Sequence, residues 1–119
     1  MYTDSGVKTF TAGEALEAAR RVKLSSGYGD QVEYADAADD YVGVTLAAAA
    51  AGAEIAVKLK RCSQGSVEVE ASVAITAGAT IYGAADGKVS ASSTGTDKFG
   101  KALEAASGSG AIIEALMDD

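Results

Sequence analysis

The feature that most limits the fold is a period-two alternation of apolar residues in the middle of the chain. Two series show it: Ile55, Val57 and Leu59, followed by Val67, Val69, Ala71, Val73 and Ile75. Because neighbouring side chains of a β-strand point to opposite faces, this spacing is typical of strands with one buried face. We therefore expect strands rather than helices to build the core.

The polar positions of these two series predict how they pair. Lys58 and Lys60 alternate with the apolar residues of the first series, and Glu68 and Glu70 alternate with those of the second. A hairpin closed by the loop 62–66 would place Lys60 opposite Glu68 and Lys58 opposite Glu70 on the solvent side. We therefore expect a hairpin in which ion pairs cover the outer face, rather than a pair of catalytic carboxylates.

Glycine-containing turns predict two further strand pairs. Asp86 and Gly87 lie between two β-prone segments, and glycine supplies the positive φ that tight hairpins require. Segments 100–106 and 111–117 are joined by the flexible residues 107–110. With many short strands and no proline, the chain is predicted to be mainly β. The expected fold is a small antiparallel β-barrel or β-tulip-like domain with at most one or two short helical turns.

Two segments are ambiguous between helix and strand. Residues 11–24 combine strong helix formers and the capping-box spacing of Thr11 and Glu14 with a β-prone end. We predict a strand for residues 20–24 and leave residues 12–19 open between helix and strand. Residues 45–53 are interpreted as a connection of small residues that contains at most one helical turn. The phrase Ala-Gly opens three similar pieces, at 12–16, 51–55 and 77–81, which indicates repeated architecture rather than chemistry.

Length and charge restrict the organisation of the chain and its partners. The 119 residues are predicted to form one domain, with a flexible N-terminal arm at 1–9, a single β-barrel unit at 10–117 and an acidic tail at 118–119. The net charge of −7 argues against direct binding to nucleic acid. No long apolar segment and no basic, hydrophobic leader is present, so we expect no membrane contact and synthesis in the cytoplasm.

The sequence offers little for catalysis, and we predict no enzyme activity, no catalytic residue, no cofactor and no metal. Histidine is absent, which excludes the common general base, and the single Cys62 is interpreted as a bystander. Asp36, Asp39 and Asp40 lack the spacing of a calcium loop and are interpreted as a solvated turn. Residues 27–32 contain Gly-x-Gly but are followed by a predicted strand, so they indicate a turn and not a phosphate site.

The order of these pieces resembles the capsid cement, or head decoration, proteins of tailed bacteriophages. The pieces are "FTAGEALEAARRVKL", "YADAADDYVGVT", "AGAEIAVKL", "ITAGATIYGAADGKVS" and "GKALEAASGSGAIIEALM". The resemblance implies a β-rich barrel or tulip domain on the outer surface of the virion capsid. It further implies that the chain cements neighbouring major capsid subunits, commonly as a homotrimer, without catalytic residues and after synthesis in the host cytoplasm.

Within this interpretation, the polar N-terminal arm is the predicted capsid contact. Its residues are Met1, Tyr2, Thr3, Asp4, Ser5, Gly6, Val7, Lys8 and Thr9. An end without a role is the alternative for this segment. The alternative function is a small β-barrel binding module, or an enzyme subunit, that recognises a carbohydrate or another small ligand. An aromatic-lined groove would favour it, but the five tyrosines are scattered and tryptophan is absent.

Overall fold

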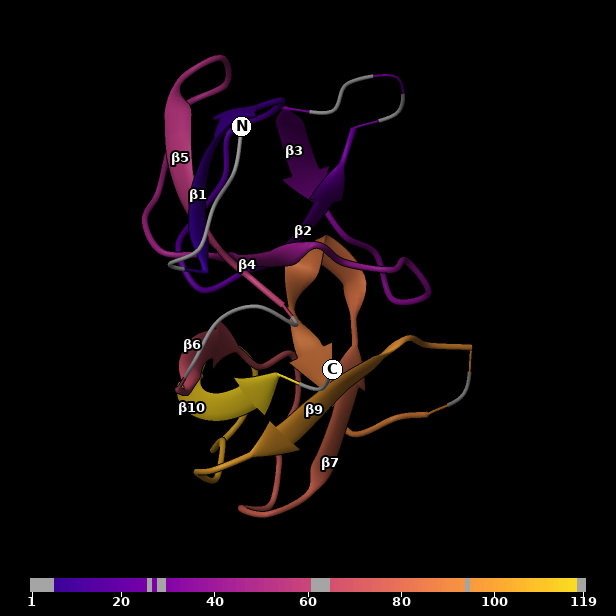
Figure 1. Cartoon of the computed structure of the whole chain (residues 1–119). Coiled ribbons are helices and arrows are strands. Elements are labelled where there is room, and N and C mark those ends of the chain that lie inside the picture. The colour runs from indigo at the N-terminus through magenta and orange to yellow at the C-terminus, as the bar shows by residue number, and fades with distance from the viewer. Residues whose placement is uncertain (1–5, 26, 28–29, 61–64, 94, 118–119) are drawn as a thin grey trace.

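The computed structural model describes residues 6–25, 27, 30–60, 65–93 and 95–117. Figure 1 shows these residues as two β-sheets joined by loops. The strands are β1 (Val7–Ala12), β2 (Arg21–Leu24), β3 (Gln31–Tyr34), β4 (Gly43–Thr45), β5 (Glu54–Leu59), β6 (Val67–Glu70), β7 (Thr80–Gly83), β8 (Val89–Ser90), β9 (Lys98–Ala102) and β10 (Ile112–Met117). A single 3-10 turn, η1 (Ala85–Gly87), connects β7 to β8. Within the described ranges, no helix is long and apolar enough to cross a membrane.

The first sheet is a closed barrel with the strand order β1-β3-β2-β4-β5. β1 runs antiparallel to β5 and parallel to β3, which closes the barrel. Inward residues of these strands, together with Leu16 from the loop after β1, make a compact core: Phe10, Ala12, Leu16, Val22, Val32, Ile55 and Val57. The closed arrangement leaves no free edge on this sheet.

The second sheet is open and has the order β6-β10-β9-β7-β8. Its buried side chains form one cluster with Ala35, Tyr41 and Val44 of the barrel half. The ring of Tyr41 stacks on that of Phe99 with 5.1 Å between centroids, and the Tyr41 hydroxyl donates to the Phe99 carbonyl oxygen at 3.2 Å. The barrel therefore packs on the open sheet through Ala35, Tyr41 and Val44, and it also keeps a core of its own.

The structure confirms the fold class and several local predictions. β9 and β10 pair antiparallel, as do β7 and β8 on either side of Asp86 and Gly87. Asp86 and Gly87 both have positive φ, 57° and 75°. Residues 21–24 form a strand. Two loops, 13–19 and 46–53, are linked by an isolated β-bridge between Leu16 and Ala49.

The predicted hairpin between the two central strands is wrong. β5 pairs with β1 and β4 in the barrel, while β6 pairs with β10 in the second sheet. Lys58 therefore lies opposite Val7 and Val44, and Glu68 lies opposite Glu114. Alternation specifies the inward face of a strand but not its neighbour, because any strand with a matching face offers the same backbone hydrogen bonds.

One smaller expectation about the apolar residues also fails. Val73 is 45 % exposed because β6 ends at Glu70 and the chain then leaves the sheet. β10 lies between β6 and β9, away from the edges of the second sheet. Its outward residues Ile112 and Leu116 are nevertheless exposed, at 53 % and 42 %.

Candidate interaction surface

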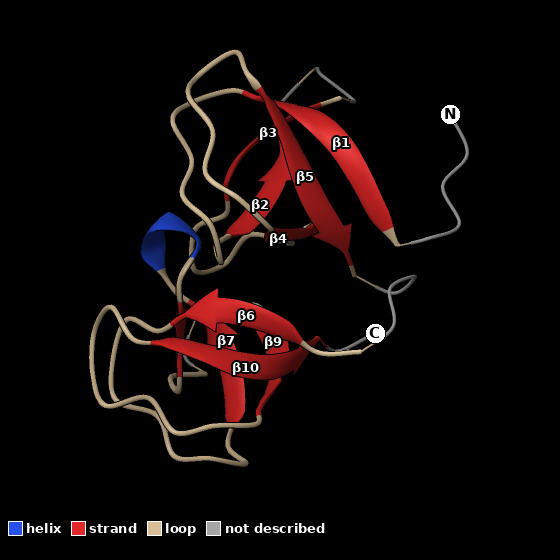
Figure 2. Cartoon of the chain, turned by 90° about the vertical axis from the view of Figure 1, so that its left-hand side faces the viewer, coloured by secondary structure: helices blue, strands red, loops and turns tan. Residues whose placement is uncertain are grey.

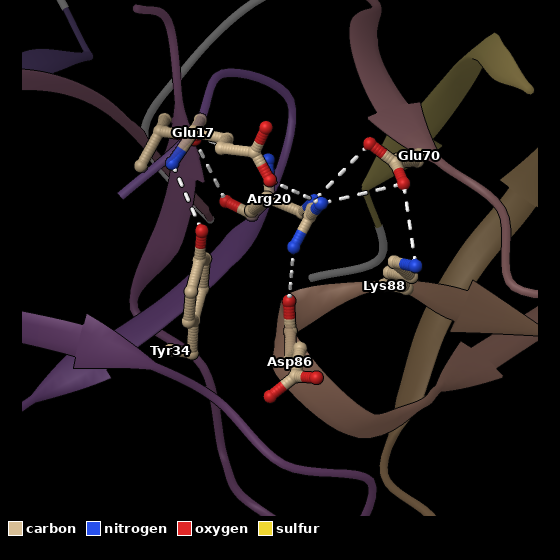
Figure 3. Close-up of polar contacts among 7 residues, drawn as sticks. Glu17, Arg20, Tyr34, Glu70, Asp86 and Lys88 are labelled. Atoms are coloured by element: carbon tan, nitrogen blue, oxygen red, sulfur yellow. Dashed lines mark hydrogen bonds and ion pairs between the residues drawn. The ribbon is translucent and has the colours of Figure 1, made fainter. Parts of the chain in front are cut away.

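A charged cluster joins the barrel to the second sheet, and Arg20 lies at its centre (Figure 3). Nε of Arg20 donates to Oε1 of Glu70 at 3.2 Å, and Nη1 donates to the carbonyl oxygen of Asp86 at 3.0 Å. Glu70 also faces Nζ of Lys88 at 3.4 Å, and Nη2 of Arg20 lies 2.8 Å from Oε2 of Glu17. The side chains of Arg20 and Glu70 are only 7 % and 15 % exposed, so water screens their attraction weakly. The cluster therefore ties the two sheets together.

The adjacent Arg21 is buried completely in the same junction. Its guanidinium donates to four backbone carbonyl oxygens, those of Ala35, Asp36, Ala84 and Lys88. Burial lowers the pKa of Arg21, and the nearby Asp97 acts in the opposite direction. Glycine at position 83 is needed here, because a Cβ would lie 2.7 Å from Nη2 of Arg21. The junction is thus held by a cation that carbonyl dipoles solvate in place of water.

A groove lies at the boundary between the two sheets. It is lined by Ala18, Ala19, Thr45, Leu46, Lys58, Ser66, Val67, Glu68 and Ile112. Leu46 and Ile112 are 47 % and 53 % exposed, so two large apolar side chains flank the groove. Val7 lies opposite Lys58 in the β1–β5 ladder, which places the start of β1 beside the same groove. Such apolar exposure is typical of an interaction surface.

The structure describes only part of the predicted N-terminal arm. Residues 1–5 lie outside the described residues. Gly6 is buried, and its carbonyl oxygen accepts the N–H of Leu59 at 2.7 Å. Residues 7–9 belong to β1 and pair with β5, so the arm does not extend to Thr9 as expected. These residues are held because each pairs with β5 in the barrel ladder.

The acidic turn at residues 36–40 is held by lysines. Oδ2 of Asp39 accepts from Nζ of Lys23 at 2.9 Å and from the backbone N–H of Asp36 at 2.9 Å. The hydrogen bond from Lys23 is the main cause of the lowered pKa of Asp39, and it also raises the pKa of Lys23. Asp40 pairs with Lys60, which directly follows β5. In the described part of the chain, no three metal-ligating side chains of the Cys, Asp and Glu types gather.

Sequence reasoning missed the charged junction between the sheets. Glu70 was assigned to a solvated face opposite Lys58, but it pairs with Arg20 and Lys88. Lys58 instead donates to the carbonyl oxygen of Ser66 at 2.7 Å. The adjacent residues Arg20 and Arg21 were the available signal. Neighbouring side chains of a strand point to opposite faces, so the two arginine side chains cannot both be equally exposed to water. Cys62 lies outside the described residues.

Comparison with known proteins identifies a matching family and a solved structure with a similar fold. A family described as phage cement protein matches residues 3–117 of the chain. Among solved structures, the head fiber gp8.5 N base of bacteriophage phi29 shares the fold with a TM-score of 0.74 and 21% sequence identity, covering 94% of this chain and 92% of that chain. No match was found among curated proteins. Because the family match spans nearly the whole chain, it confirms the resemblance drawn from the order of the sequence pieces: the chain belongs to the phage cement protein family.

Proposed function

We propose that the chain attaches to the outer surface of a phage head, where it contacts the major capsid protein and ties neighbouring copies together. The family match over residues 3–117 is the observation that carries this proposal. The role is structural, and the proposal assigns no catalytic step to any residue. The buried charged junction supports it, because a tie between subunits must itself resist separation of its two sheets.

The proposed contact surface consists of residues 1–9 and the groove between the sheets. Val7 lies beside Lys58 in the ladder, and Lys58 lines the groove. The start of β1 therefore lies beside the part of the groove that Lys58 lines. Within this surface, Val7–Thr9 form a fixed base, and residues 1–5 extend the contact onto the capsid.

We further propose that the protein forms a homotrimer on the capsid. The outward residue Leu116 of β10, which does not line the groove, exposes apolar surface that a second copy could cover. Light scattering of the free protein between about 1 and 100 µM, together with copy counting on saturated heads, tests the trimer. Copies bound singly on heads and a strict monomer in solution would overturn it.

Binding to expanded heads that lack this protein tests the function itself. Purified protein is expected to sediment with the heads, to saturate at a defined copy number and to be displaced by unlabelled protein. Many copies on one lattice gain from avidity, so saturation is expected even when each contact is weak. Protein that stays in the supernatant at every concentration would refute the assignment.

A further inference from the structure

The barrel and the second sheet contain the same supersecondary unit. In the barrel, β1 and β5 pair with Thr11 opposite Glu54 and Phe10 opposite Ile55. In the second sheet, β9 and β7 pair with Lys101 opposite Thr80 and Gly100 opposite Ile81. When β9 is matched to β1 and β7 to β5, the two pairs of opposite residues in one sheet therefore correspond to the two pairs in the other.

The turn that precedes β5 and β7 is also the same in both units. In the barrel, the N–H of Ala12 donates to the carbonyl oxygen of Ala53 at 2.8 Å, and the N–H of Gly52 donates to that of Ala12 at 2.7 Å. In the second sheet, Ala102 donates to Ala79 at 2.9 Å, and Gly78 donates to Ala102 at 2.8 Å. Gly52 and Gly78 have φ values of 85° and 84°.

Each unit then continues into two loops that hydrogen-bond to each other. We call residues 13–19 with 46–53 the first double loop, and residues 103–110 with 72–79 the second double loop. Leu16 and Ala49 exchange backbone hydrogen bonds of 2.8 and 2.9 Å, and Ala106 and Ile75 exchange bonds of 2.9 and 3.1 Å.

The loops leave the units in the same way. Ala19 has a φ of 63° and donates to the carbonyl oxygen of Thr45 at 3.0 Å. At the corresponding place, Gly110 has a φ of 91° and donates to that of Ala71 at 2.9 Å.

The match extends to exposed side chains that no core requires. The corresponding exposed pairs are Ala15 and Ala105, Ala48 and Ala74, Ala51 and Ala77, and Glu14 and Glu104. Both glutamates also accept a backbone N–H from a neighbouring strand: Glu14 accepts that of Tyr34 in β3 at 3.1 Å, and Glu104 accepts that of Glu114 in β10 at 2.7 Å. Exposed alanines have no packing role, so the fold alone does not account for the shared surface.

The two double loops lie on one side of the molecule, which is the left side in Figure 2. One belongs to the barrel and the other to the second sheet, and η1 lies between them. The first residues of β1 lie on the opposite side, away from these loops. The start of β1 is therefore remote from both double loops, whereas the groove meets the first double loop at Ala18, Ala19 and Leu46.

We propose that the two double loops are two equivalent docking sites, each for one copy of the same partner protein. The inference rests on the proposed function, so the partner is the major capsid protein, present in neighbouring copies on the head. Alanine loses no side-chain entropy on binding and lets two backbones approach closely, which suits a flat apolar surface. Glu14 and Glu104 at the margins fit a partner surface with basic side chains around an apolar centre.

Substitution of corresponding alanines tests the duplication. The variants are Ala48→Lys in the first double loop, Ala74→Lys in the second and the double variant. Ala91→Lys, at an exposed alanine that follows β8, is the matched control. Each single variant keeps one site and loses the avidity gain, so the affinity for expanded heads should fall by on the order of 100-fold in both. The double variant should bind more weakly than either single variant, because it keeps only the contact proposed for residues 1–9, and all four proteins should keep the wild-type melting temperature.

The outcomes separate this inference from the function on which it rests. Wild-type protein that fails to bind heads refutes both. Wild-type protein that binds, with loop variants that bind equally well, refutes the docking sites alone. An effect confined to Ala48→Lys or to Ala74→Lys refutes their equivalence.

Discussion

Arg20 and Glu70 form an ion pair that crosses the boundary between the two sheets, with 3.2 Å from Nε to Oε1. Arg20 precedes β2 of the barrel, and Glu70 ends β6 of the second sheet. Both side chains are nearly buried, and each has a further charged neighbour, Glu17 and Lys88. Removal of one partner would leave the other charge poorly solvated, which costs more than the loss of an exposed pair.

Glu70→Gln is therefore expected to destabilise the fold, whereas Glu68→Gln is not. The glutamine keeps one acceptor but loses the charge that Arg20 faces, so the free energy of unfolding should fall by about 1–3 kcal/mol. Glu68 is exposed and lies opposite Glu114, and its neutralisation should change stability by about 0.5 kcal/mol or less. Urea unfolding of the two variants measures the difference. Equal free energies of unfolding would contradict a stabilising role for the charged junction. Glu70→Gln should not change binding to heads under conditions where the protein is folded, because Glu70 does not line the proposed groove.

Truncation at two points separates the arm from the barrel. Deletion of residues 1–5 should weaken binding to heads and leave the melting temperature unchanged, because β1 stays complete. Deletion of residues 1–9 removes Val7–Thr9, which pair with β5, and should lower the melting temperature by about 5–10 °C. Thermal unfolding and sedimentation with heads give the two readouts. Wild-type binding by the shorter deletion would exclude residues 1–5 from the contact.

Three glycine substitutions test the repeated turn. Gly52 and Gly78 have positive φ and open space around a new Cβ, so alanine at either position should cost the same, about 1 kcal/mol. Gly43 differs, because a Cβ there would collide with the backbone carbonyl of Lys58 across the β4–β5 ladder. Gly43→Ala should therefore be the most damaging of the three in chemical unfolding. Clearly unequal costs at Gly52 and Gly78 would contradict the equivalence of the turns.

The ion pair of Lys23 and Asp39 predicts the pH dependence of stability. The pKa of Asp39 is lowered from its ordinary value of 3.8, so its contribution is present above pH 3.8 and is lost as the pH falls through the folded-state pKa. The pKa of Lys23 is raised from 10.5, so its contribution is lost as the pH rises above that value. Wild-type protein should lose more stability below pH 3.8 than Asp39→Asn. Melting temperatures of both proteins, recorded against pH in low salt, measure this difference, since salt screens an exposed pair. The same dependence on pH in both proteins would argue against a stabilising pair.

The amino-acid sequence alone determined the features that depend on neighbouring residues. Period two in Ile55 and Val57 predicted which side of β5 is buried, and Asp86-Gly87 predicted the turn between β7 and β8. β9 and β10 were predicted to pair because a short glycine-rich loop joins them. In each case the residues that decide the outcome are close in sequence, so their preferences act before distant contacts form.

Only the tertiary structure decided which strands became neighbours across longer distances. β5 and β6 follow each other in the chain but belong to different sheets, because β1 and β10 offer them equally suitable edges and faces. Glu70 faces Arg20 rather than Lys58 for the same reason, and the three Ala-Gly phrases acquire different roles: Gly52 and Gly78 form corresponding turns, while Gly13 does not. Alternation predicts which face of a strand is buried, and a charged residue predicts the sign of the charge that it pairs with. Neither predicts which strand or residue the partner is. The partner is chosen when the whole set of strands buries its apolar faces together.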